Sequence, residues 1–229
     1  MLTQDQAQGF AQEAQTTTDN ILKEHYQIYV LDRLYGASFS EQLIFKGGTA
    51  LRLAYGSFRF SEDLDFSVQS EIDFKEFSAA VNQIPKIFPE ASIKEIYNKS
   101  HTLFAKIMFG VSFKPQAVGI KVEINKGVKK IEQTVVLLKS PFNNLEITGR
   151  VYTLEQILND KIKLLDIRRE PRDLFDIWYI DQRLGQTFNV ENKYKYTQKE
   201  LLDNLNPFIP KKERRVLDLF RNESEIVHN

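Results

Sequence analysis

The sequence predicts an α+β protein, with an N-terminal helix and a mixed sheet over residues 1–149 and a helical lobe over residues 150–229. Apolar residues recur at helical spacing near the start of the chain, and again after Gly149. Between these parts lie segments rich in β-branched and aromatic residues, which favour strands. The 229 residues are 42% hydrophobic, which excludes general disorder and allows a sizeable core.

The first half of the predicted core mixes helices with short strands. The expected helices span residues 18–35, 50–55 and 73–84, and the expected strands span residues 43–45 and 58–68. Gly56 is suited to end the second helix in a left-handed conformation. Pro85 is expected to end the third helix, because proline lacks the backbone N–H that a helix needs.

A run of strands and then a run of helices complete the chain. The expected strands span residues 92–97, 103–111, 118–124 and 134–138. The expected helices span residues 153–168, 172–184, 197–205 and 210–222.

The charge and cysteine content exclude several kinds of protein. Lys and Arg number 31, as do Asp and Glu, which argues against a protein that coats nucleic acid by bulk charge. The absence of cysteine excludes disulfides, thiolate zinc sites and iron–sulfur clusters. Six lysines nevertheless lie between 114 and 139, either as solvated strand edges or as a strip that faces nucleic acid. They are Lys114, Lys121, Lys126, Lys129, Lys130 and Lys139.

The sequence has the character of a soluble protein. Its first twenty residues are polar and lack the basic and apolar regions of a signal peptide. It also has no stretch of about 18 apolar residues that could form a membrane span. We therefore expect a cytoplasmic protein without membrane contact.

Asp63 and Asp65 are the first candidate site residues. In a strand, residues two apart point to the same face, so their carboxylates stand side by side while Leu64 and Phe66 take the other face. Neighbouring carboxylates repel unless they are protonated or bridged by a cation, and Mg²⁺ is a common bridge where phosphates also bind. An exposed acidic strand is the ordinary alternative for a pair considered alone.

The glycines at 47 and 48 make a ligand site more convincing. A Gly-Gly turn between a strand and a helix lets the backbone approach a ligand, and the helix N-terminus favours phosphate. Thr49 adds a hydroxyl, either as helix N-cap or as phosphate ligand. A phosphate turn followed closely by paired carboxylates predicts a nucleoside triphosphate site.

Three further charged residues stand at unusual positions. Glu123 is a candidate third metal ligand, or an ordinary outward strand residue. Lys161 lies on the apolar face of its helix, where it either reaches a pocket or snorkels to solvent. Asp173 also lies on an apolar helix face. It either orients Lys161 or the acceptor, or is simply a carboxylate favoured by the positive end of the helix dipole.

The motifs together resemble one family. The segments F-K-G-G-T-A-L-R-L, R-F-S-E-D-L-D-F and D-K-I-K-L-L-D-I-R-R-E-P-R-D-L-F-D-I-W resemble, in this order, the AbiEii/MenT-like nucleotidyltransferase family. These are toxins of type IV toxin–antitoxin systems that act in abortive infection, a defence against phage, within the polymerase-beta-like nucleotidyltransferase superfamily. The resemblance covers roughly residues 20–205. It implies a polymerase-beta-like core followed by a helical C-terminal lobe.

The resemblance implies a role for each motif residue. The metal-binding aspartates of the family fall on Asp63 and Asp65, and its catalytic lysine and aspartate fall on Lys161 and Asp173. Its phosphate-binding turn falls on the segment Lys46-Gly47-Gly48-Thr49. Thr49 stands where the superfamily often has Ser, and Glu123 where many members have Asp; both changes preserve the chemistry. Mg²⁺, as one or two ions, and an NTP substrate follow from the family.

The resemblance implies transfer of a nucleoside monophosphate to an RNA, with the 3′ end of tRNA as the expected acceptor and translation as the process inhibited. Lys46, Arg59 and Lys161 could neutralise phosphate charge, and the arginines at 168, 169 and 172 could receive RNA phosphates or form a solvated helix end. Two alternatives remain: transfer to a protein or small-molecule hydroxyl, and nucleotide binding without catalysis. A toxin also implies a cognate antitoxin as partner.

Overall fold

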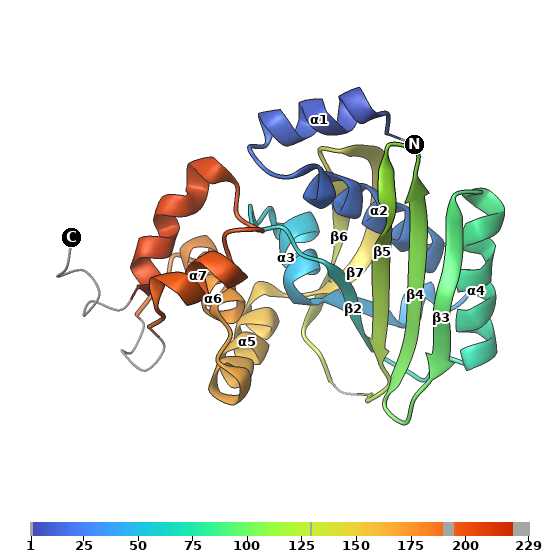
Figure 1. The fold of residues 1–229 in the computed structure, drawn as a ribbon. Coiled ribbons are helices and arrows are strands. Elements are labelled where there is room, and N and C mark those ends of the chain that lie inside the picture. The colour runs from blue at the N-terminus through green and yellow to red at the C-terminus, as the bar shows by residue number, and fades with distance from the viewer. Residues whose placement is uncertain (1, 129, 190–194, 222–229) are drawn as a thin grey trace.

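The computed structural model describes residues 2–128, 130–189 and 195–221. Its centre is a mixed seven-stranded sheet with the strand order β3-β4-β5-β2-β1-β7-β6 (Figure 1). The strands are β1 (Leu43–Lys46), β2 (Asp63–Val68), β3 (Ala91–Asn98), β4 (Thr102–Val111), β5 (Lys114–Asn125), β6 (Gln133–Ser140) and β7 (Asn143–Tyr152). β2 pairs with β5, and β1 with β7, in parallel, whereas the other neighbouring strands are antiparallel.

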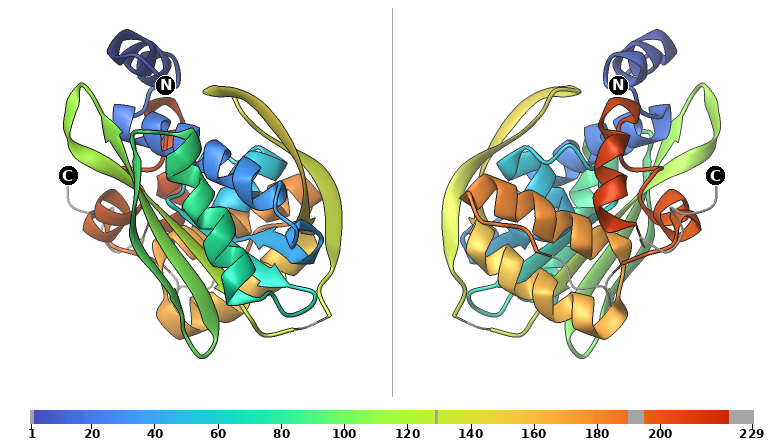
Figure 2. Two further views of the ribbon diagram at one scale, coloured as in Figure 1. Left: turned by 90° about the vertical axis from the view of Figure 1, so that its right-hand side faces the viewer. Right: turned by 90° about the vertical axis from the view of Figure 1, so that its left-hand side faces the viewer.

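Helices surround this sheet and form the C-terminal part. They are α1 (Gln4–Glu13), α2 (Thr18–Tyr35), α3 (Gly47–Tyr55), α4 (Phe74–Ile87), α5 (Leu154–Arg168), α6 (Pro171–Leu184) and α7 (Gln198–Asn204), with 3₁₀ segments η1 (Ser40–Gln42) and η3 (Lys211–Phe220). Helices α2 and α4 lie side by side over one face of the sheet (Figure 2). The expected α+β class is confirmed.

Two hydrophobic cores underlie the two parts of the chain. The larger core joins α2 and α4 to the sheet, with Phe66, Ile107 and Val122 among its fully buried residues. The second core joins helices α5, α6 and α7, and it includes Ile44 of β1 and Leu51 of α3. The helical part is therefore packed directly behind the Gly47–Gly48 turn, which brings residues from both parts of the chain together.

Most expected elements form close to their predicted places. α2 spans residues 18–35 as predicted, and each of the four strands predicted between 92 and 138 is present, with longer bounds. The strand predicted over 58–68 begins only at Asp63, because Phe60 turns to meet the loop at Phe208 through a backbone hydrogen bond of 2.8 Å. Helix α4 does not end before Pro85 but continues through it to Ile87. Pro85 lies in the last turn, where only one helical hydrogen bond is lost.

Two elements were not expected from the sequence. Helix α1 is held by a capping box between Thr3 and Gln6, but it buries only Ala7 and Ala11, too little apolar surface for a visible pattern. Strand β7 contains Gly149, the residue after which the sequence predicts the division between the two parts of the chain. A Cβ atom there would lie 2.6 Å from the ring of Tyr35, so this glycine serves a close contact inside a strand.

The change from sheet to helices occurs after Tyr152, where Thr153 caps α5. The division after residue 149 stays a prediction. The last predicted helix is a 3₁₀ segment instead, and its expected end at 222 lies outside the described residues, as does Lys129. Among the described residues, no helix is long and apolar enough to cross a membrane.

Candidate active site

Three charged residues form a row across the centre of the sheet. Asp65 of β2 stands opposite Lys46 of β1 on one side and opposite Glu123 of β5 on the other. Their neighbours Leu64 and Val122 are fully buried on the helix-covered face, so the charged side chains occupy the other face. The alternation that placed Asp65 and Glu123 on one face is therefore confirmed.

Asp65 sits in a strongly charged environment. Burial, together with the carboxylates of Asp63 and Glu123, raises the pKa of Asp65 to about 6, although Lys46 and Lys161 act in the opposite direction. Asp63 is more exposed, and its Oδ1 lies 3.6 Å from Nζ of Lys121. The raised pKa of Asp65 reflects mainly the burial of its carboxylate, to which its acidic neighbours add.

Two glycines allow the start of α3 to approach these carboxylates. Gly47 has a φ of +79°, and a Cβ atom there would lie 2.8 Å from Oδ2 of Asp65. A Cβ atom at Gly48 would lie 2.4 Å from Nη2 of Arg59. Neither position can hold a side chain without movement of a charged neighbour, so the Gly-Gly pair is required by this packing.

Thr49 does not cap the helix. The N-cap of α3 is Lys46, and Thr49 is the third helical residue, with only 1% of its surface exposed. Its hydroxyl donates a 2.6 Å hydrogen bond to the carbonyl of Asp63. The N-cap expectation is wrong because the helix includes both glycines. Thr49 instead ties α3 to the first residue of β2, while its role as a phosphate ligand stays a prediction.

Lys161 lies in a buried network of charges between α5 and α6. Its Nζ is 2.8 Å from Oδ1 of Asp173 and 2.6 Å from Oδ2 of Asp176, and both aspartates are fully buried. Arg59 completes the network with two hydrogen bonds of 2.8 Å to the carboxylate of Asp176. Lys161 therefore points into the protein from the apolar side of α5, and Asp173 orients it.

The aspartates of this network are held in their ionised forms. Burial by itself would raise the pKa of Asp173, but the hydrogen bonds of Arg168 and the charge of Lys161 hold it below its ordinary value. The pKa of Asp176 is lowered for a similar reason, because Arg59 and Lys161 outweigh the effect of burial. The network thus fixes the position of the Lys161 ammonium group before any ligand binds.

Asp176 is the site residue that sequence reasoning missed. It lies three residues after Asp173, and this spacing places both side chains on one face of α6. That signal was available in the sequence. Arg59 was expected to neutralise phosphate charge, but in the structure its guanidinium bonds Asp176 and the residue is only 4% exposed. Direct phosphate binding by Arg59 stays a prediction.

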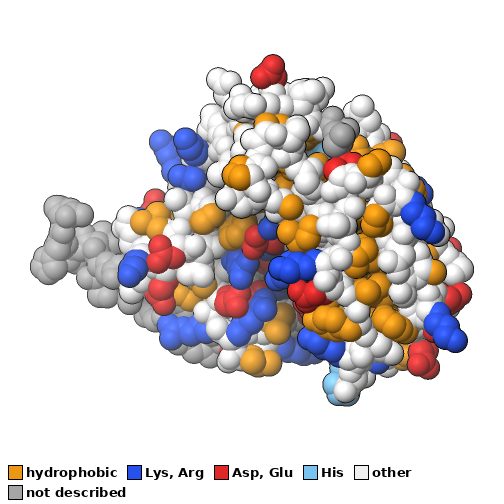
Figure 3. All heavy atoms as spheres, turned by 45° about the vertical axis from the view of Figure 1, so that its right-hand side comes forward, with side chains coloured by type: hydrophobic (Ala, Val, Ile, Leu, Met, Phe, Trp, Pro, Cys, Tyr) orange, Lys and Arg blue, Asp and Glu red, His pale blue; other side chains and the backbone are white. Residues whose placement is uncertain are grey.

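Two pockets flank the charged row. One, of about 220 Å³, is lined by Lys46, both glycines, Asp65, Lys161 and Arg168, among others. The other, of about 130 Å³, shares Gly48, Asp65 and Lys161 with it and extends to Asp63, Asp173 and the arginines at 59 and 172. Figure 3 shows acidic and basic side chains crowded together near the middle of one face. The predicted phosphate and carboxylate residues thus meet at one site.

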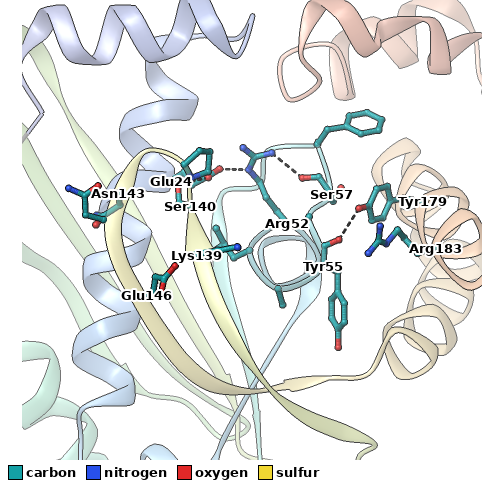
Figure 4. A pocket seen from close by; sticks show the side chains of 16 residues that line it. Glu24, Arg52, Tyr55, Ser57, Lys139, Ser140, Asn143, Glu146, Tyr179 and Arg183 are labelled. Carbon is teal, nitrogen blue, oxygen red and sulfur yellow. Dashed lines mark hydrogen bonds and ion pairs between the residues drawn. The ribbon is translucent and has the colours of Figure 1, made fainter.

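A pocket of about 950 Å³ lies elsewhere (Figure 4). Its buried charges satisfy one another: Arg52 pairs with Glu24 and donates to the carbonyl of Ser57 at 3.0 Å. Glu24 also accepts from the hydroxyl of Ser140 at 2.7 Å. None of the predicted catalytic, phosphate or metal residues lines this pocket, so its size does not make it the site of the chemistry.

The carboxylates of the charged row are candidate ligands for a metal ion. Asp63 and Asp65 offer the oxygen ligands that Mg²⁺ prefers, and the charge around Asp65 suits a cation. Among the described residues, however, no group of three or more acidic or histidine side chains is arranged to hold a metal. A two-carboxylate site fits the structure, and Glu123 as a third ligand stays a prediction.

The predicted strip of lysines is spread across the sheet, because β5 and β6 are separated by three other strands. Lys114 pairs with Asp19 of α2, Lys126 donates to the side chain of Asn98 at 2.7 Å, and Lys139 lines the large pocket. At the end of α5, Arg168 bonds Asp173 at 2.6 Å. Arg172 bonds Glu170 at 3.2 Å, and Arg169 donates to the carbonyl of Lys195 at 3.4 Å. Lys114, Lys126 and the three arginines have partners of their own, and a role of the basic residues in RNA binding stays a prediction.

Comparison with known proteins places this site in a family. No curated protein sequence matches the chain. The fold is similar to the crystal structure of JHP933 from Helicobacter pylori, with a TM-score of 0.53 and 20% identity over 86% of this chain and 76% of that one. It is also similar to MenT4, a nucleotidyltransferase toxin from Mycobacterium tuberculosis, with a TM-score of 0.56 and 19% identity over 85% of this chain and 68% of that one.

The sequence itself gives the family. The model of the family described as nucleotidyl transferase AbiEii toxin, type IV toxin–antitoxin system, matches residues 29–221, which include both glycines, the paired aspartates of β2 and the buried network around Lys161. The chain is therefore a nucleotidyltransferase and belongs to the AbiEii toxin family.

Proposed function

We propose that this enzyme transfers a nucleoside monophosphate from an NTP to the 3′-hydroxyl of an RNA, with tRNA as the acceptor, and so inhibits translation. A bond forms between the acceptor oxygen and the α-phosphorus, the bond from the α-phosphorus to the β-phosphate bridge breaks, and pyrophosphate leaves. The observation that carries the proposal is the meeting of Asp63 and Asp65 with the Gly47–Gly48 turn and Lys161 around adjoining pockets.

In this proposal the glycine turn and the lysines bind phosphate, and the carboxylates bind the metal ion. The backbone at Gly47 and Gly48 lies beside Asp65 and starts α3, whose N-terminus favours phosphate oxygens. Lys46 and Lys161 line the same pocket and neutralise charge on the triphosphate. Asp173 and Asp176 hold Lys161 in place. Asp63 and Asp65, with Glu123 beside them, would hold Mg²⁺, which when bound neutralises phosphate charge and makes the attacking hydroxyl more acidic.

The family supports the biological setting, whereas the RNA acceptor is our own proposal. A type IV toxin acts together with a cognate antitoxin, which we propose as a partner of this chain. The arginines at 168, 169 and 172 lie where α5 meets α6, next to the pocket that contains Asp63. They are the groups we propose for contact with RNA phosphates. Activity on tRNA and a role in phage defence place the protein in the cytoplasm.

The test is a transfer reaction with purified protein, Mg²⁺, labelled NTPs and total RNA. We expect label on RNA with the wild type and none with Asp63→Ala or without the divalent ion. Asp203→Asn is the matched control, because Asp203 is an exposed acidic residue in α7. Label on protein or on a small molecule, and not on RNA, would select another acceptor. Nucleotide binding without any transfer would support a non-catalytic role.

A further inference from the structure

The pocket that contains the glycines continues into a second pocket. This second pocket has a volume of about 330 Å³ and shares Lys46, Tyr152 and Asp160 with the first. We call it the amide pocket, because Asn125, Gln156 and Asn159 line it. The two pockets thus form one elongated cavity that begins at the predicted phosphate site and ends between β5 and α5.

The two ends of this cavity differ in chemistry. The first end presents Lys161 and Arg168 beside the glycine turn, which suits phosphate groups. The amide pocket presents three carboxamides, each of which carries both hydrogen-bond donors and acceptors. The edge of a nucleobase also carries both donors and acceptors, and an Asn or Gln side chain can recognise a base by forming two hydrogen bonds with that edge.

The amides retain free hydrogen-bonding capacity. Asn125 uses its oxygen for the backbone N–H of Gly127 at 2.8 Å, which leaves its NH₂ group available. Gln156 is more engaged: it donates to Asp160 at 3.3 Å, and its side-chain oxygen accepts from the backbone N–H of Glu132 at 3.5 Å. Asn159 is exposed, and its side chain makes no hydrogen bond with another described residue. Its complete amide therefore faces a ligand or solvent.

The floor of the amide pocket is fixed. The ring of Tyr152 is 4% exposed, and its hydroxyl shares a 2.7 Å hydrogen bond with Ser67, which is also buried. Nζ of Lys46 lies 6.0 Å from the centre of that ring and sits between the two pockets. A rigid aromatic floor with polar groups around it is a common form of ligand site.

We infer that the amide pocket binds the base of the NTP and that Asn159, with Asn125 and Gln156, sets the base preference of the enzyme. This inference rests on the proposed function and adds the specificity-determining residues to it. The triphosphate occupies the glycine end, and the base occupies the amide end. Neither Asp63 nor Glu123 lines these two pockets, which leaves their part of the row for the acceptor.

The test measures equilibrium binding of each of the four NTPs, with Mg²⁺ and without acceptor, by calorimetry. The proteins are the wild type, Asn159→Ala, Asn159→Asp and Asn82→Asp. Asn82 is an exposed helical asparagine in α4 and controls for the added negative charge. Asn159 is itself exposed, so its variants are expected to fold, which a thermal melt confirms.

We expect Asn159→Ala to reduce the ratio between the weakest and tightest Kd by about tenfold. Asn159→Asp exchanges a donor for an acceptor and should change the order of preference, whereas Asn82→Asp should leave it unchanged. The inference is overturned if the four Kd values keep their ratios in both Asn159 variants. If the wild type transfers nucleotide but the Asn159 variants keep the wild-type ratios of the four Kd values, only this inference fails and the proposed function stands. A wild type that binds none of the four NTPs removes the proposed function as well.

Discussion

Nζ of Lys161 lies 2.6 Å from Oδ2 of Asp176, and both side chains are buried between α5 and α6. The same carboxylate holds Arg59, whose guanidinium fills the space beside Gly48. Asp176 therefore connects the helical part of the chain to the turn where α3 begins. A buried aspartate that neutralises two cations has consequences for both stability and activity.

Loss of Asp176 should destabilise the protein strongly. Asp176→Ala leaves Arg59 and Lys161 buried without their shared carboxylate, and we expect the free energy of unfolding to fall by about 3–5 kcal/mol. Urea denaturation measures this change. Asp203→Asn, at an exposed position, should change it by no more than about 0.5 kcal/mol. Equal effects of the two substitutions would contradict the structural role of Asp176.

Acid should remove the contribution of the buried aspartates. The lowered pKa values of Asp173 and Asp176 mean that their stabilising effect is complete above the unfolded-state value of 3.8. It is lost as the pH falls through their lower native values. The difference in unfolding free energy between the wild type and Asp176→Asn should therefore shrink in urea titrations below pH 3.8. If the difference grows as the pH falls, the pKa values of these aspartates are not lowered by folding, and this account of the network is wrong.

Asp65 should behave in the opposite way. Its pKa is raised to about 6, so the folded protein holds this proton more tightly than the unfolded chain, and ionisation above pH 6 costs stability. Without added divalent ions, Asp65→Asn should raise the unfolding free energy by about 2 kcal/mol at pH 7.5, and by less at pH 4.5. The same variant should lose nucleotide transfer. A destabilised Asp65→Asn protein at pH 7.5 would contradict this view of the site.

The two glycines should not tolerate alanine. Gly47→Ala places a Cβ atom against Asp65 at a positive φ, and Gly48→Ala places one against Arg59. We expect each to cost about 1–3 kcal/mol, measured by urea denaturation, and to impair transfer. Gly9→Ala is the matched control, because no atom lies within 4 Å of the added Cβ atom in α1. That variant should gain about 1 kcal/mol from better helix propensity.

Much of the site could be predicted because local patterns determine it. The i, i+2 spacing in a strand fixed the common face of Asp63 and Asp65, and burial of Leu64 confirms it. Likewise, a charged side chain on an apolar helix face is buried and needs an opposite charge beside it, and Lys161 and Asp173 form such a pair. These inferences need only the periodicity of one element and the cost of an unpaired buried charge.

The rest depends on contacts between distant segments. Asp176 acquires its importance from Arg59, which lies 117 residues away in the sequence. The position of Gly149 inside a strand cannot be seen in the sequence, because the neighbour that requires a glycine there, the ring of Tyr35, comes from α2. Thr49 caps nothing because the left-handed conformation of Gly47 lets α3 start three residues earlier than a helix capped by Thr49 would. Such features require the tertiary structure.

The most direct measurement compares tRNA with a free 3′ end to tRNA whose terminal ribose has been oxidised with periodate. Purified enzyme, Mg²⁺ and one labelled NTP at a time are used, with Asp63→Ala as the inactive control. The proposed mechanism predicts label on the intact tRNA, none on the oxidised tRNA, and release of one pyrophosphate for each nucleotide added. Equal labelling of both tRNAs, or equal labelling by Asp63→Ala, would contradict transfer to the 3′-hydroxyl at this site.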